Sequence, residues 1–274
     1  MARQHRRMTT TTATTLDTSA RAMLSKVPEV TVAFWVVKVL ATTVGETFAD
    51  FLATTLGLGL PLTSLIMAAL LAIALVFQFR SARYIPGLYW LAVVLISVVG
   101  TVASDNLVDN LNVSLWVSSA IFSVLLAATF TAWFVSEKTL SIHSIFTTRR
   151  EAFYWLTILF TFALGTSAGD LLAEQLNIGY LPSALLFLLM IGVVALARYV
   201  FKLGAVISFW IAYVLTRPLG ASTGDYLSQP VKDGGLGLGT TMTSVIFLSV
   251  ILVVVISLSL AERRRRGQIA PLPA

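Results

Sequence analysis

The sequence predicts an all-α integral membrane protein with eight transmembrane helices, built from four parallel helical-hairpin repeats. Three observations predict this fold. The composition is 57% apolar and only 12% charged, with a mean hydropathy of +0.87, and a soluble globule of 274 residues cannot bury that much apolar surface. Apolar stretches of spanning length recur along the chain. One short motif recurs in every second stretch.

Each of the eight apolar segments is close to the roughly 20 residues that a helix needs to cross a bilayer. The segments lie near 29–53, 60–79, 85–108, 114–135, 151–176, 181–201, 204–228 and 239–260. They define a transmembrane domain over 28–260. We expect a flexible tail over 1–27 and a basic tail over 261–274.

The basic residues predict the orientation of these helices. Of the 19 lysines and arginines, 16 fall in the two tails or in the connections after the second, fourth and sixth segments. The positive-inside rule places that side in the cytoplasm, so both termini are expected there. The leading segment has no apolar core of the kind that a secretory signal peptide needs.

A repeated motif divides the chain into four hairpins. Each copy has an aromatic residue and Trp, then glycine ten residues after the Trp, and aspartate five residues after the glycine, within the blocks "GETFAD", "GTVASD", "GTSAGD" and "GASTGD". The repeats span about 28–80, 83–136, 148–202 and 203–260. The motif residues are Gly45, Gly100, Gly165 and Gly220, with Asp50, Asp105, Asp170 and Asp225. Each repeat has two spans, so the copies are parallel and predict pseudo-two-fold or four-fold symmetry.

Small residues predict how the first helices of the repeats pack. The residue four positions after each glycine is also small: Ala49, Ser104, Gly169 or Gly224. This small-xxx-small spacing lets helix backbones approach closely in a membrane, so we expect these helices to surround a common centre. We expect the aromatic pairs to lie in the interfacial belt, where amphipathic rings anchor.

The aspartates share one depth and predict an acidic funnel on the outer side. Each lies fifteen residues after the motif Trp, about 22 Å along a helix axis. A second polar rung follows four residues later on the same helical face. It consists of Thr54, Asp109, Glu174 and Gln229. Glu46 adds a deeper acid. A carboxylate inside a bilayer costs about 2.5–3.5 kcal/mol and normally marks an ion path or a partner. The alternative role is to cap a helix end.

Two basic residues interrupt the same helices. Lys38 lies eight residues before Glu46, and Arg217 lies eight before Asp225. We interpret them as charge partners of the acids or as gating cations. Pro218 follows Arg217 and frees a backbone carbonyl in the middle of a span, which predicts that segment 204–228 moves.

These residues predict a membrane transporter for a cation, with Glu46, Asp50, Asp105, Asp170 and Asp225 as the binding residues. Hard oxygen ligands suit divalent manganese, magnesium or calcium, and Glu46, Asp50, Asp170 and Asp225 are the predicted metal ligands. The chain has no cysteine and two histidines, which disfavours zinc and copper. Protons are a candidate coupling ion, because two close carboxylates seldom both ionise.

Two other function classes stay open. The acids could only lock the bundle of a structural or regulatory subunit. A membrane-embedded enzyme acting on lipid is disfavoured, because the spans contain no histidine, no cysteine and no Gly-x-Ser-x-Gly motif. We expect no enzyme activity, no tightly bound cofactor and no nucleic-acid partner. The lipid bilayer is the expected surroundings, and the oligomeric state is left open.

Three stretches resemble a bacterial family labelled as uncharacterised membrane-anchored proteins. They are "KVPEVTVAFWVVKVLATTVGETFAD", "EAFYWLTILFTFALGTSAGD" and "FWIAYVLTRPLGASTGDYLSQPVKDGGLGL". The resemblance covers about 27–260 and implies a polytopic protein of the bacterial inner membrane. The repeated acids are also similar to those of manganese and calcium exporters, which suggests export. The chain lacks the contiguous Glu-x-Gly-Asp-Lys/Arg motif of those exporters.

The orientation can be tested directly, because the chain has no cysteine of its own. We expect Arg80→Cys and Lys138→Cys to react with an impermeant thiol reagent only from the cytoplasmic side. Lys232→Cys should react only from the outside. The measurement is labelling of intact cells against inside-out vesicles, and outward labelling at the first two positions would refute the topology.

Overall fold

The computed structural model describes residues 26–269. The predicted tail over 1–27 therefore lies almost entirely outside the described residues, whereas 261–269 of the predicted basic tail are described. At the inner edge of the first tail, Lys26 and Val27 are buried against the domain. The last helix continues past residue 260 to Ile269, with an exposed flank at Leu260.

The described chain forms four helical hairpins, and eight of its helices are long and apolar enough to cross a membrane. This confirms the predicted fold class. The first helices of the hairpins are α2 (Val32–Asp50), α4 (Pro86–Asp105), α6 (Thr148–Asp170) and α8 (Ala205–Ser228). The second helices are α3 (Gly59–Arg80), α5 (Leu115–Glu137), α7 (Tyr180–Tyr199) and α9 (Thr240–Ile269).

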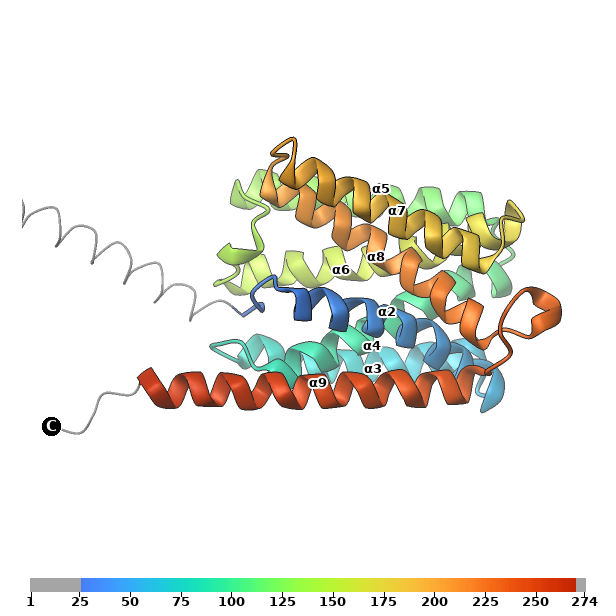
Figure 1. Ribbon diagram of the computed structural model, residues 1–274, viewed down its shortest axis with the longest axis horizontal. Helices are drawn as coiled ribbons and strands as arrows, with labels where there is room; N and C mark the ends of the chain where they lie inside the picture. The colour runs from blue at the N-terminus through green and yellow to red at the C-terminus, as the bar shows by residue number, and fades with distance from the viewer. Residues whose placement is uncertain (1–25, 270–274) are drawn as a thin grey trace, which may run out of the picture.

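The first helices form an inner ring and the second helices cover it. Around the ring, α2 packs against α4, α4 against α6, α6 against α8, and α8 against α2. More than half of the most apolar stretch of each inner span is buried, compared with less than a third for each outer span. The inner ring is therefore the core of the domain. Both ends of the described chain lie at one end of the bundle (Figure 1), which we call the terminal end.

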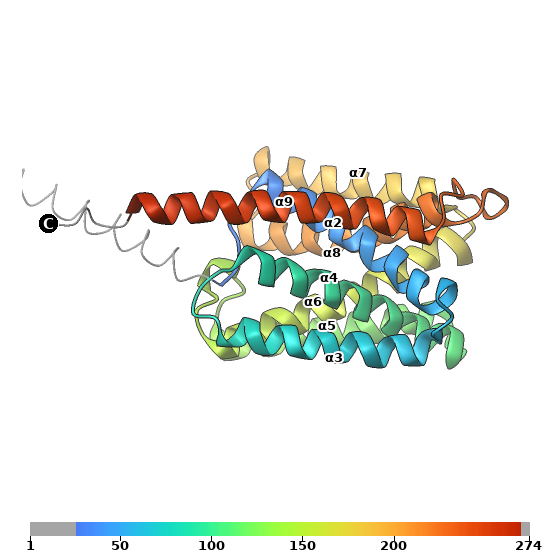
Figure 2. The same ribbon diagram turned by 90° about the horizontal axis from the view of Figure 1, so that it is seen from below.

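Each outer helix packs against the inner helix of the next repeat. Thus α3 lies on α4, α5 on α6 and α7 on α8. The last outer helix, α9, returns to the first inner helix, α2, as the two views show (Figure 1, Figure 2). The four hairpins consequently interlock as a closed cycle.

The motif glycines make the same contact four times around the inner ring. Each lies against the residue three positions before the glycine of the next inner helix. The contacts join Gly45 to Ser97, Gly100 to Phe162, Gly165 to Arg217 and Gly220 to Thr42. A Cβ atom on each glycine would lie 2.5–2.6 Å from the Cβ of its neighbour. Only glycine allows this approach, and the repetition gives the ring its four-fold pseudo-symmetry.

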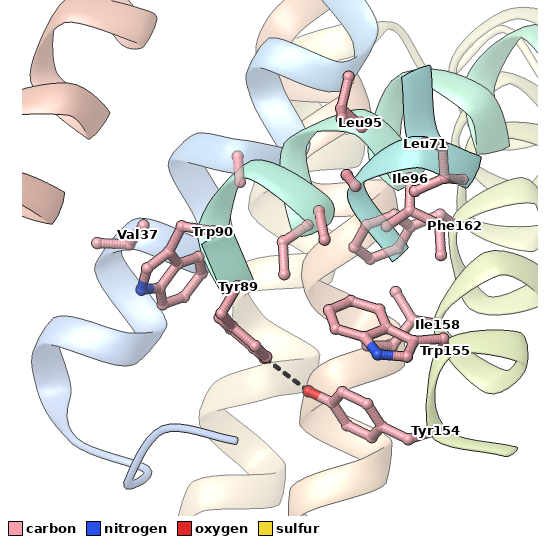
Figure 3. Packing of buried hydrophobic residues seen from close by; sticks show 14 of the residues in the cluster. Val37, Leu71, Tyr89, Trp90, Leu95, Ile96, Tyr154, Trp155, Ile158 and Phe162 are labelled. Atoms are coloured by element: carbon pink, nitrogen blue, oxygen red, sulfur yellow. Dashed lines mark hydrogen bonds between the residues drawn. The ribbon is translucent and has the colours of Figure 1, made fainter. Parts of the chain in front are cut away.

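The aromatic pairs are mostly core residues, so the predicted interfacial belt is wrong for them. Phe34, Tyr89 and Tyr154 are buried. The Tyr89 and Tyr154 hydroxyls lie 2.6 Å apart (Figure 3). The motif Trp residues of α4, α6 and α8 are buried too, whereas Trp35 and Phe209 are partly exposed. The reason is that these pairs begin inner helices, which neighbouring helices cover. We call this packed group the aromatic cluster, and it fills the terminal end of the ring.

We expect Gly220→Ala to lower the stability of the folded protein by about 1–3 kcal/mol, because overpacking forces close backbones apart. The added Cβ would meet Thr42 Cβ at 2.5 Å and the Thr42 backbone at 2.9 Å. The measurement is thermal unfolding in detergent. Gly192→Ala is the matched control, since a Cβ there meets nothing within 4 Å. Equal midpoints for the two variants would contradict the close packing.

Candidate functional site

Polar residues occupy three successive levels on the inner helices, each four residues from the next. The central layer follows the motif glycines by one residue and contains Glu46, Thr101, Thr166 and Ala221. The aspartate layer is Asp50, Asp105, Asp170 and Asp225. The outer layer is Thr54, Asp109, Glu174 and Gln229. Exposure rises along this series, from a fully buried central layer to a mostly exposed outer layer.

A fully buried guanidinium, that of Arg217, ties the central layer together. Its Nη2 donates to Glu46 Oε2 at 2.8 Å, to Thr166 Oγ1 at 2.6 Å and to Thr101 Oγ1. Its Nη1 donates to the backbone oxygen of Thr42 at 3.2 Å. Arg217 and Glu46 are 0% and 5% exposed. One side chain of α8 therefore forms hydrogen bonds with all three other inner helices.

The local sequence explains how Arg217 reaches the centre. Its Cβ faces Gly165, where the missing side chain lets α6 and α8 come close. Pro218 lies inside α8 without ending the helix. Beside it, Thr42 Oγ1 of α2 donates to the Thr216 backbone oxygen at 3.2 Å. This hydrogen bond joins α2 to α8 two residues before the proline.

The two basic residues differ from their predicted pairings. Arg217 pairs with Glu46 on another helix instead of with Asp225. Lys38 forms no ion pair with an acid among the described residues. Its Nζ lies 4.1 Å from the ring centroid of Phe162 and 4.2 Å from that of Tyr213. Spacing along one helix did not reveal these partners, because both basic residues interact across the ring.

The aspartate layer is acidic and unneutralised. In the part of the chain that the structure describes, no lysine or arginine forms an ion pair with any of its four members. Gln229 Nε2 lies 3.5 Å from Asp50 Oδ2. The charge of Glu46 acts on all four aspartates, and Asp50 and Asp170 also act on other members of the layer. The ring thus gathers five carboxylates within electrostatic range of one another.

These carboxylates do not form a ready-made metal cluster. Among residues 26–269, no group of three or more His, Asp or Glu side chains is close enough to hold a metal ion. The predicted metal-ligand set of Glu46, Asp50, Asp170 and Asp225 is not assembled as such. One reason is that Arg217 occupies Glu46.

The inner helices widen immediately after the aspartates in the first three repeats. Asp50, Asp105 and Asp170 each end an α-helix, and a five-residue π-helical turn follows. The turns are η1 (Phe51–Thr55), η2 (Asn106–Asn110) and η4 (Leu171–Gln175). Such turns are rare and are often found at functional sites. In the fourth repeat α8 continues to Ser228 instead.

The outer layer and the second small positions also form contacts between helices. Tyr180 donates to Glu174 Oε1 at 3.0 Å, and Asp109 is exposed.

The small residues four positions after the motif glycines also form contacts between inner helices. The Ser104 hydroxyl oxygen lies 2.7 Å from that of Ser167. Gly169 and Gly224 face Ala221 and Glu46 on the next inner helix. The predicted second packing position is therefore used alongside the first.

Sequence reasoning missed two groups of buried polar residues. Thr101 and Thr166 form hydrogen bonds with Arg217. The sequence did contain a signal for them, because each directly follows a motif glycine, as Glu46 does. The other group lies at the terminal end, where Lys26 Nζ is 2.7 Å from Glu151 Oε2 and 3.1 Å from the Phe79 backbone oxygen. Gln78 Nε2 donates to Glu151 Oε1 at 3.2 Å.

Comparison with known proteins places the chain in a repeat family. The model of the family described as Repeat of Unknown Function (DUF347) matches four times, at residues 33–84, 88–139, 153–203 and 208–264. These matches cover most of the chain and agree with the four hairpins, so the protein belongs to this family. No curated protein and no solved structure matches it.

We expect Arg217→Met to destabilise the fold by about 3–5 kcal/mol, because it leaves the buried Glu46 carboxylate without its partner. The paired variant Arg217→Met with Glu46→Gln should recover much of that loss. Thermal unfolding in detergent measures both. Asp233→Asn removes an exposed acid 3.9 Å from Lys232 and should leave the midpoint unchanged. Additive losses in the paired variant would show that the two side chains do not depend on one another.

Proposed function

We propose that this member of the DUF347 repeat family is a transporter that moves a cation across the bacterial plasma membrane. The observation that carries the proposal is the aspartate layer: four repeats each contribute one carboxylate to the same level of the inner ring, and no described lysine or arginine forms an ion pair with them. Both termini are assigned to the cytoplasm on the distribution of basic residues. The aspartate layer then faces the outer half of the membrane.

The energetics of charge in a bilayer support a binding role. A carboxylate at membrane depth is costly, and such residues commonly line ion or proton paths. A carboxylate with a purely structural role would be stabilised most by a buried cationic partner, as Arg217 stabilises Glu46. The aspartates form no ion pair with a described lysine or arginine, so a cation arriving from outside would meet several carboxyl groups that no base occupies.

The central layer would act as the gate of this path. Arg217 occupies Glu46, the deepest acid of the ring, and the aromatic cluster fills the ring on the terminal side. An incoming cation would compete with Arg217 for Glu46. Moving Arg217 out of the central layer would remove its hydrogen bonds to α2, α4 and α6 together. The opening of the path would thereby depend on binding.

A divalent metal ion such as manganese is the substrate that the chemistry favours, with magnesium and calcium as alternatives. Carboxylate and hydroxyl oxygens are hard ligands. Magnesium-sized ions retain several waters in protein sites, so few carboxylates are needed at once. We propose export as the direction and proton coupling as the energy source.

A structural or regulatory role is the second candidate. The observation that favours it is the Arg217 network, which joins all four inner helices in one buried cluster. In that case the network would serve only to hold the ring, and the aspartates would bind no transported ion.

Reconstituted protein in liposomes tests the proposal against this alternative. We expect flux of at least one cation from a panel containing manganese, magnesium, calcium, sodium and potassium. Asp50→Asn and Asp170→Asn should weaken the apparent affinity about tenfold or more, equivalent to about 1.4 kcal/mol, because each removes a negative charge from the layer. Asp233→Asn is the matched control in an outer connection. Absence of flux for every ion, or flux insensitive to these substitutions, would favour the structural role.

A further inference from the structure

Lys38 is a buried amine that the aspartate layer does not explain. Its side chain is 0% exposed, and its Nζ has no hydrogen-bond partner among the described residues. The rings of Phe162 and Tyr213 face it at 4.1 Å and 4.2 Å. Cation–π contacts of this kind stabilise an ammonium, but they do not replace the hydrogen bonds that it loses on leaving water.

The charges around Lys38 are unbalanced. Arg217 of α8 is the charged group that acts on it, and that guanidinium already pairs with Glu46. The guanidinium therefore has an acid to pair with, whereas the Lys38 ammonium has none among the described residues. Of the other elements packed on α2, α4 brings the titratable Tyr89 to the aromatic cluster, and α9 carries Glu262, Arg263 and Arg264 near its C-terminal end. No carboxylate pairs with Lys38 within residues 26–269.

We propose that Lys38 is the group that exchanges the coupling proton with the cytoplasm. This inference rests on the proposed cation transport. When a cation binds Glu46, Arg217 loses its partner and its unpaired charge repels the Lys38 ammonium. One N–H bond of that ammonium then breaks, the nitrogen keeps the electron pair, and the proton leaves. When the cation departs, Arg217 returns to Glu46 and the amine takes up a proton again.

Tyrosine hydroxyls mark a route for this proton toward the terminal end. Tyr213 borders Lys38. The hydroxyls of Tyr154 and Tyr89 are 2.6 Å apart, and the buried Tyr213 hydroxyl has no hydrogen-bond partner among the described residues. The ring of Tyr84, in the connection before α4, meets that of Tyr89 at 5.6 Å. Four tyrosines thus lie between the buried amine and the end assigned to the cytoplasm, and one pair of them, Tyr154 and Tyr89, is joined directly through its hydroxyls.

Two substitutions of Lys38 should both abolish proton movement in liposomes but differ in their effect on cation flux. Lys38→Gln has no proton to release, so we expect cation flux down its own gradient to persist while proton movement, followed with a trapped pH dye, disappears. Lys38→Arg keeps a charge that proteins do not deprotonate, so both cation flux and proton movement should be lost. Lys138→Gln, in a connection at the terminal end, is the matched control and should behave like the unmodified protein.

A second measurement compares the unmodified protein with one variant in detergent. Adding the transported cation to detergent-solubilised protein in weak buffer should release one proton per bound cation, read with a pH indicator. Lys38→Met, which replaces the amine with an apolar side chain of similar length, should release none; its elution on size exclusion confirms folding. Cation flux without proton release, or unchanged release from Lys38→Met, would overturn the role of Lys38 and leave cation transport standing. No cation flux at all would overturn the proposed function itself.

Discussion

The close approach of four helix backbones at the motif glycines is the constraint on which the rest of the structure depends. At each contact a Cβ atom would overlap the neighbouring helix, so the ring is as narrow as backbones allow. A narrow ring brings the residue after each glycine to a common centre. It also sets the next level, the aspartates, one helical turn away. Shape and charge are thus determined by the same short motif.

The four-fold pattern of the backbone carries an asymmetric set of side chains. Lys38 and Glu46 both lie on α2, and Arg217 and Pro218 lie on α8. These two helices come from the first and last repeats, yet they are neighbours in the ring. The other two inner helices contribute hydroxyl groups at the same level. Duplication therefore supplied the frame, and two adjacent helices concentrate the charges that could make one seam of the ring move.

Much of the fold could be predicted because its signals are local and repeated. The spacing from Trp to glycine to aspartate identified the hairpins and placed Asp50 and its counterparts at one depth. Partners across the ring could not be predicted in this way. Arg217 was matched to Asp225 on its own helix, but helix crossing brings it to Glu46. The burial of Tyr89 and Tyr154 was missed because hydropathy does not distinguish a lipid-facing ring from one covered by neighbouring helices.

The interlocked order of the hairpins has a consequence for biosynthesis. Among the eight described spans, α2 is synthesised before the others, but the outer helix that covers it, α9, is synthesised after them. Until α9 is made, the side of α2 that it will cover lacks this protein neighbour. Its buried lysine and glutamate must also wait for α8. The first of the described spans is therefore the last to gain its neighbours, and a nascent chain interrupted before the fourth hairpin would carry unpaired charges in the membrane.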